Sequence, residues 1–235
     1  MIGDRLFAVG DIHGCLHEMD ALLAALPLQP ADTLVFLGDY IDRGPSPAGV
    51  IERLCRLRAE RANTVFLRGN HEDMCLAFLG RPGRHGAAFT ANGGDRTAAS
   101  YGVAPGDAAA LERALPAAHL EFIEATRTSY DHGRYLCVHA GIRPGVPLAE
   151  QDPTDLLWIR ADFLQTPHDL DRTVVFGHTP VEDVLVDLPY KIGIDTGCVY
   201  GRLLTAVELP AGRLYHVARG ETRVRESALE PPALA

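Results

Sequence analysis

The first third of the chain alternates between short apolar runs and longer amphipathic stretches. The apolar runs predict strands at residues 5–9, 33–37 and 64–67, and the amphipathic stretches predict helices at 15–26, 47–58 and 71–79. Pro47 is compatible with the first turn of the second helix. Because strands separated by helices of this length form βαβ units, we expect a parallel sheet here.

Residues 80–128 break this alternation. They are rich in Ala and Gly and show only short helical patterns, the clearest at 111–115 and 120–125. We interpret them as a helical insertion beside the functional site rather than as a separate domain, and we expect residues 1–235 to form a single domain.

The rest of the chain is dominated by strand patterns. Residues 126–138 predict a hairpin with Asp131-His132-Gly133 as its turn. Further strands are predicted at 173–176, 184–186, 190–194, 203–208 and 213–217, and the last ten or so residues, with Pro231-Pro232, are expected to be frayed. An early βαβ half and a late, mostly β half predict two sheets. The expected fold is α/β: a β-sandwich flanked by helices in α-β-β-α layers, with the ligand loops at one edge.

Composition excludes several classes of protein. The net charge is −9, whereas a protein that coats a nucleic acid polymer would show a basic face. No apolar stretch approaches the roughly 20 residues that span a bilayer, and the first residues lack the pattern of a signal peptide. We therefore expect a cytoplasmic protein without a membrane partner. The five scattered cysteines are expected to be small buried hydrophobes in a reducing compartment.

Five short motifs, each after an apolar run, carry the candidate chemistry. They are Gly10-Asp11-Ile12-His13-Gly14, Gly38-Asp39-Tyr40-Ile41-Asp42-Arg43-Gly44, Arg68-Gly69-Asn70-His71-Glu72, His139-Ala140-Gly141 and Gly177-His178-Thr179. Their Asp, His and Asn side chains suit Mn²⁺, Fe or Zn²⁺ better than a thiolate-seeking ion. The five together predict a two-metal site for phosphate ester hydrolysis.

Each motif taken alone has a simpler interpretation. Asp11 and His13 could belong to an ordinary turn, and Asn70 could cap a helix, a role that does not exclude metal ligation. His139 and His178 could be structural histidines. Asp39 follows a strand, and its two carboxylate oxygens could bridge two metals. The occurrence of all five motifs in this order favours the metal site.

The motifs resemble those of the phosphoprotein phosphatase (PPP) family of calcineurin-like metallophosphoesterases, in its bacterial and phage form. The resemblance implies a calcineurin-like β-sandwich and a dinuclear centre of two divalent metal ions, which we expect to be Mn²⁺, with Fe or Zn also possible. It implies that the metal ligands are Asp11, His13, Asp39, Asn70, His139 and His178. It further implies that Arg43, Arg68 and Arg160 hold phosphate oxygens, and that His71, oriented by Asp42, protonates the leaving alkoxide. We expect direct in-line attack by metal-bound hydroxide without a phosphoenzyme.

Within this family the sequence favours a serine/threonine protein phosphatase acting on phosphorylated proteins or peptides. Symmetrical bis(5'-nucleosyl)-tetraphosphate hydrolases are the alternative, but they usually lack an acidic residue at the position of Asp42 and carry Asp at that of Glu72. Small phosphomonoesters are expected to be cleaved as well. A catalytically silent binding module and a cyclic-nucleotide phosphodiesterase are further alternatives.

Overall fold

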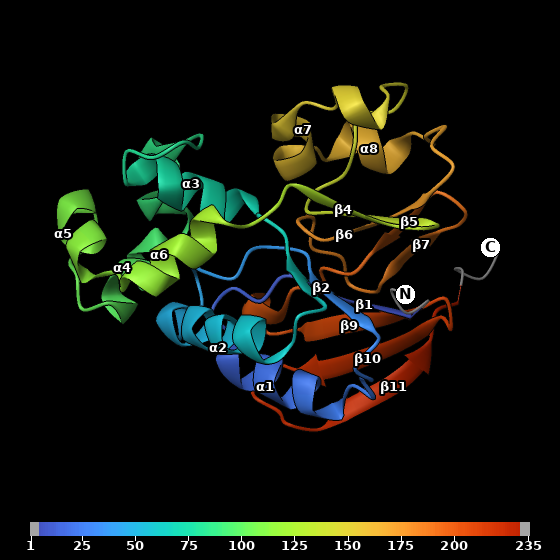
Figure 1. Ribbon diagram of the computed structural model, residues 1–235, viewed down its shortest axis with the longest axis horizontal. Helices are drawn as coiled ribbons and strands as arrows, with labels where there is room; N and C mark the ends of the chain where they lie inside the picture. Colours follow the sequence, from blue (N-terminus) through green and yellow to red (C-terminus); the bar gives the residue numbers. More distant parts are fainter. Residues whose placement is uncertain (1–4, 231–235) are drawn as a thin grey trace.

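The computed structural model describes residues 5–230. The expectations for the first four residues and for Pro231-Pro232 lie outside the described residues. The chain forms two stacked sheets with helices on both outer faces (Figure 1). This arrangement confirms the predicted α/β sandwich.

The first sheet contains six strands in the order β11-β10-β9-β1-β2-β3. Its strands are β1 (Leu6–Val9), β2 (Thr33–Phe36), β3 (Thr64–Phe66), β9 (Leu203–Leu209), β10 (Arg213–Ala218) and β11 (Val224–Ala228). β1 pairs with β2 in parallel, as expected, and with β9 in antiparallel. The expectation of an early and a late sheet was therefore wrong for β9–β11, which complete the first sheet. Strands this far apart in the chain are paired by tertiary packing, which local patterns do not report.

The second sheet contains five strands in the order β4-β5-β6-β8-β7. Its strands are β4 (Ser129–His132), β5 (Tyr135–Val138), β6 (Thr173–Phe176), β7 (Leu185–Asp187) and β8 (Lys191–Gly193). β4 and β5 form the expected hairpin, but its turn lies at Gly133 and Arg134 rather than at Asp131-His132-Gly133. Asp131 and His132 pair with β5, so the turn begins later than the sequence suggested.

The helices divide between three locations. α1 (Leu16–Ala25) and α2 (Pro47–Glu60) cover the outer face of the six-stranded sheet, and α7 (Pro153–Trp158) and α8 (Ala161–Gln165) cover the five-stranded sheet (Figure 1). α3 (Asn70–Phe78) and the helices of residues 80–128 gather to one side. The latter are α4 (Gly94–Ser100), α5 (Ala108–Ala114) and α6 (Ala117–Glu124).

Several short elements were not predicted. α7 and α8 have six and five residues, too few for apolar positions to recur over several helical turns. β11 occupies part of the region that was expected to be frayed, and there the expectation was wrong, because β11 pairs with β10 from Val224 to Ala228. No helix within residues 5–230 is long and apolar enough to cross a membrane.

Three apolar layers hold the sandwich together. Phe7 and Val9 of β1 face α1 and α2, whereas Leu6 and Ala8 of the same strand pack between the two sheets. A third cluster joins the five-stranded sheet to α8 through Phe163. β1 is buried on both faces, which explains its continuous apolar run.

The parallel strands of both sheets end at the same edge of the sandwich. β1, β2 and β3 lead into the first three motifs, and β5 and β6 lead into His139 and His178. His139 Nδ1 lies 2.9 Å from the carbonyl oxygen of Leu37, and the backbone N–H of His178 donates to Asp11, so both contacts cross between the sheets. Sheets of this kind place their ligands at the carboxyl ends of parallel strands.

Candidate dinuclear metal centre

Asp39 lies at the centre of the cluster formed by the five motifs. Its Oδ2 is 3.4 Å from Nε2 of His13, and its Oδ1 is 3.5 Å from Nε2 of His139. Two groups of potential ligand atoms therefore share this carboxylate. One consists of His13, Asp39 and His71, and the other of Asp39, His139 and His178. The shared carboxylate supports the expectation that Asp39 bridges two cations.

In His13 and His139, the ring proton is on Nδ1, so that Nε2 presents a lone pair to the cluster. Nδ1 of His13 lies 2.8 Å from the carbonyl oxygen of Ile41, and Nδ1 of His139 lies 2.9 Å from that of Leu37. Nδ1 must donate in each contact, so Nε2 carries a lone pair. Nε2 of His139 then faces the amide oxygen of Asn70 at 2.9 Å, which is also an acceptor. Two acceptors at this distance repel each other unless a cation lies near both, so the donor set fits a metal ion.

Asn70 and His178 extend the second group. Nδ1 of His178 is 2.9 Å from the same Asn70 oxygen, and the other ring nitrogen of His178 is buried without a partner among the described residues. Asn70 is the first residue of α3 rather than its N-cap, which is Gly69. The cap interpretation of Asn70 was therefore wrong, and its side chain is turned toward the histidines.

The electrostatics keep these imidazoles neutral. Burial lowers the pKa of His13 to about 3, despite the charge of Asp39. Burial also lowers the pKa of His139, and it lowers that of His178 further, with help from His139 and Arg160. Neutral imidazoles are the form that binds metal ions.

Asp11 contributes from the first sheet but belongs to neither group. Its carboxylate accepts the backbone N–H of His178 at 3.0 Å. Burial and the charges of Asp195 and Asp39 raise its pKa. A bound cation would remove this repulsion between carboxylates.

Backbone strain is concentrated at the same residues. Six non-glycine residues within 5–230 have a left-handed backbone, and five of them belong to the motifs: His13, Asp39, Asp42, Arg43 and His178. Such conformations cost free energy and cluster at functional sites. Gly177 is also required, because a Cβ there would collide with the carboxylate of Asp11.

His71 and Asp42 form a buried pair beside the cluster. Nδ1 of His71 lies 2.6 Å from Oδ2 of Asp42, and the Thr97 hydroxyl donates to the other Asp42 oxygen at 2.5 Å. Thr97 belongs to α4 of the insertion, and the sequence did not identify it. Nε2 of His71 is 3.9 Å from Oδ2 of Asp39, so it faces the cluster.

Glu72 has a structural function. Oε2 accepts the backbone N–H groups of Asp39 and Gly69, both at 2.9 Å, and Oε1 accepts those of Tyr40 at 2.8 Å and Ile41 at 3.3 Å. The carboxylate therefore fixes the loop that carries Asp39. It is fully buried, so it supports the loop rather than contacting a substrate directly.

The three predicted phosphate-binding arginines lie in different places. Nη1 of Arg43 is 2.7 Å from Nε2 of His13, at the cluster. Arg160 is exposed at the start of α8, where its charge lowers the pKa of His139 and His178. Arg68 donates to the hydroxyl of Thr126 at 3.1 Å and to the carbonyl of Glu124 at 2.9 Å. Arg68 thus ties β3 to the end of the insertion, and its role toward phosphate stays a prediction.

Asp195 is a site residue that we did not predict. It follows β8 at the same edge, accepts the N–H of Gly197 at 3.0 Å, and raises the pKa of Asp11. Burial raises its own pKa to about 6. Its position after the apolar run 190–194 was the signal that could have identified it.

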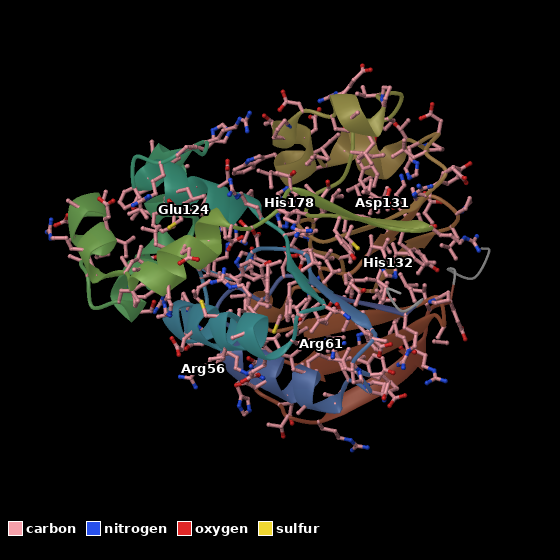
Figure 2. The ribbon with its side chains drawn as sticks, viewed as in Figure 1. Arg56, Arg61, Glu124, Asp131, His132 and His178 are labelled. Atoms are coloured by element: carbon pink, nitrogen blue, oxygen red, sulfur yellow. The ribbon has the colours of Figure 1, made fainter. Side chains whose placement is uncertain are left out.

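In Figure 2, His178 lies at the end of the five-stranded sheet that faces α3–α6, whereas Asp131 and His132 lie at the opposite end.

Known proteins are similar to this chain in sequence and in fold. The chain is 31% identical to the asymmetrical bis(5'-nucleosyl)-tetraphosphatase PrpE of Geobacillus thermodenitrificans, over 86% of this chain and 89% of the relative. It is 30% identical to PrpE of Oceanobacillus iheyensis, over 94% and 95%. The crystal structure of a candidate diadenosine tetraphosphatase matches with a TM-score of 0.70 and 25% identity, covering 91% of this chain and 93% of that one.

A protein serine/threonine phosphatase from Saccharomyces cerevisiae shares the fold, with a TM-score of 0.58 and 16% identity over 98% of this chain and 82% of that one. The family model for calcineurin-like phosphoesterases matches residues 5–201, which include all five motifs. The chain therefore belongs to the calcineurin-like phosphoesterase family, and it has the metallophosphoesterase fold and candidate metal ligands of a phosphoester hydrolase.

Proposed function

We propose that this protein hydrolyses dinucleoside polyphosphates at a centre of two divalent metal ions. The observation that carries the chemistry is the position of Asp39 between two groups of histidines. The substrate class is supported by the relatives named as asymmetrical tetraphosphatases, which match along most of their length. The sequence motifs favour phosphoproteins, with symmetrical tetraphosphatases as the alternative, and the similarity to asymmetrical tetraphosphatases changes that preference.

The residues of the site would have three roles: binding the cations, binding phosphate and donating a proton. Bound divalent cations, which we expect to be Mn²⁺, would neutralise the phosphate and lower the pKa of water. Asp11, His13, Asp39, Asn70, His139 and His178 would hold these cations. The guanidinium of Arg43 would pair with phosphate oxygens in the manner of a bidentate fork. His71 would donate the proton from Nε2 to the leaving group, because its Nδ1 is directed at Asp42.

Phosphorylated peptides and small phosphomonoesters remain a second candidate class, favoured by the His71–Asp42 pair. An alkoxide is a poorer leaving group than a phosphate, so a buried proton donor benefits a phosphomonoester more than an anhydride. Of the two residues that suggested a protein phosphatase, only Asp42 contacts the proposed proton donor, because the carboxylate of Glu72 accepts backbone N–H groups.

The deciding experiment compares diadenosine tetraphosphate with a phosphoserine/phosphothreonine peptide on protein that has been chelated and reloaded with Mn²⁺. Faster cleavage of the dinucleotide, with AMP and ATP as products, would support the proposal and the asymmetrical mode. Two molecules of ADP would indicate the symmetrical mode. Faster cleavage of the peptide would favour the second class. No turnover of either substrate by metal-loaded protein would contradict both classes and leave the silent binding module and the cyclic-nucleotide phosphodiesterase.

We also keep a cytoplasmic location as part of this proposal. The five cysteines are free, and four of them are buried. Free thiols are usual in a reducing compartment.

A further inference from the structure

Tyr200 is an exposed aromatic residue close to the candidate metal centre. It ends a short 3₁₀ helix (Cys198–Tyr200) in the connection between β8 and β9, seven residues after the last residue of β8 and five after Asp195. Its side chain is 56% exposed, and Leu188 is the only other large apolar residue of 5–230 with comparable exposure. Single exposed apolar residues are normal on a protein surface, so the significance of Tyr200 depends on its neighbours.

Arg43 connects this ring to the metal ligands. The guanidinium carbon of Arg43 lies 5.7 Å from the centre of the Tyr200 ring, within the range of a cation–π contact. The same guanidinium is 2.7 Å from Nε2 of His13. One guanidinium therefore separates an exposed aromatic ring from the cluster. Burial raises the pKa of the Tyr200 hydroxyl; the charge of Arg43 lowers it, and the charges of Asp195, Asp39 and Asp11 raise it.

The loop holds Tyr200 in a defined position. Gly197 and Gly201 flank the 3₁₀ helix with left-handed φ angles of 71° and 87°. The N–H of Tyr200 donates to the carbonyl of Gly197 at 2.9 Å, and the N–H of Gly197 donates to Asp195 at 3.0 Å. These bonds fix the backbone that carries the ring and link it to the carboxylate that follows β8. An aromatic surface on a fixed support loses little entropy when a ligand stacks on it.

We propose that Tyr200 forms a nucleobase-binding subsite, in which its ring stacks on the base of the nucleotide whose phosphate is held by Arg43. This inference rests on the proposed function and specifies how the site recognises nucleotides. Bases stack on aromatic side chains with little dependence on their identity, because every base has a π-face. Arg43 lies between the two parts of this subsite, since its guanidinium contacts His13 of the cluster and the ring of Tyr200.

The test compares two ligands that differ only in the base. Inhibition constants of AMP and ribose 5-phosphate are measured against p-nitrophenyl phosphate hydrolysis by the Mn²⁺-loaded protein. We expect AMP to bind roughly 5- to 100-fold more tightly than ribose 5-phosphate, the range of one stacked base. Tyr200→Ala should bring this ratio close to one, whereas Tyr200→Phe, which keeps the ring, should retain most of it.

Leu188→Ala is the matched control. Leu188 is 49% exposed and lies before β8, whereas the cluster lies beyond the carboxyl end of β8. The ratio of the two inhibition constants in Leu188→Ala should therefore match that of the unmodified protein. A ratio near one in the unmodified protein, or an unchanged ratio in Tyr200→Ala, would overturn the proposal. So would an equal loss in Tyr200→Phe and Tyr200→Ala, because it would assign the effect to the hydroxyl.

The proposed function is tested separately, by measuring cleavage of diadenosine tetraphosphate by the unmodified protein. If the dinucleotide is not cleaved but Tyr200→Ala abolishes the preference for AMP, the nucleobase subsite stands and the proposed substrate does not. Thermal unfolding of each variant shows that it is folded.

Discussion

Nδ1 of His71 and Oδ2 of Asp42 lie 2.6 Å apart, and both side chains are almost completely buried. This contact fixes the orientation of the imidazole and leaves its Nε2 directed toward Asp39. The second Asp42 oxygen is held by Thr97, so the insertion supports the pair. A histidine held in this way is suited to deliver a proton at one atom.

Replacing His71 tests the role of a general acid. We expect His71→Asn to lower kcat by roughly 10²–10⁴, the usual contribution of a positioned proton donor, while metal content changes little. Steady-state kinetics and elemental analysis measure both effects. His17→Asn, at an exposed position on α1, is the control. Unchanged turnover in His71→Asn would remove the assignment.

Replacing Asp42 should change the pH dependence. Burial lowers the pKa of His71, but the charges of Asp39 and Asp42 outweigh burial, so the net shift is upward from 6.5. A general acid acts when protonated, so activity should persist below this raised pKa and fall as the pH rises through it. Asp42→Asn removes one of these charges and should move the alkaline limb of the kcat profile to lower pH, by about one unit or more.

Profiles of kcat against pH for the two proteins, both loaded with Mn²⁺, provide the comparison. An alkaline limb at the same pH in both would show that His71 does not set it.

Asp39 is expected to hold two cations at once. Asp39→Asn removes the charge shared by both histidine groups, so occupancy of both metals should fall together. Elemental analysis after dialysis measures metal per chain. Asp20→Asn, on an exposed carboxylate of α1, is the control. Full occupancy in Asp39→Asn would refute bridging.

The arginines should differ in their effect on substrate binding. Arg43→Ala removes the guanidinium at His13 and should raise KM for phosphomonoesters by about 10- to 100-fold, the range of a lost charged hydrogen bond. Arg68→Ala should raise KM less, because its contacts in the structure are with Thr126 and Glu124. Arg56→Ala, on an exposed arginine of α2, provides the baseline. The proposed placement of Arg43 would be contradicted by an unchanged KM.

The carboxylate of Glu72 should stabilise the folded protein. Glu72→Gln turns one acceptor of two backbone N–H groups into a donor, leaving buried donors unsatisfied. We expect the free energy of unfolding to fall by about 2–5 kcal/mol. Denaturant unfolding of the metal-free protein measures the change without a contribution from metal binding. Glu60→Gln, at the exposed end of α2, should alter stability by less than about 0.5 kcal/mol.

Local patterns were enough to predict the early strands. β1 is apolar throughout, β2 and β3 are a Thr followed by apolar residues, and each leads into a polar motif, so all three were predictable. The pairing of β9 with β1 was not, because its partners are about 200 residues apart. The short helices α7 and α8 escaped detection because they have too few residues to show a period.

The candidate site shows the same division. The residue types of the five motifs together predict the chemical kind of the site, because Asp, His and Asn side chains after apolar runs suit a centre of divalent metal ions. The neighbours of these side chains emerge only from the packed structure: Glu72 on the backbone of the Asp39 loop, Thr97 on Asp42, and Tyr200 beside Arg43. Ligand type is a property of each residue, whereas these contacts join residues from separate segments and exist only after the sheets and the insertion have packed.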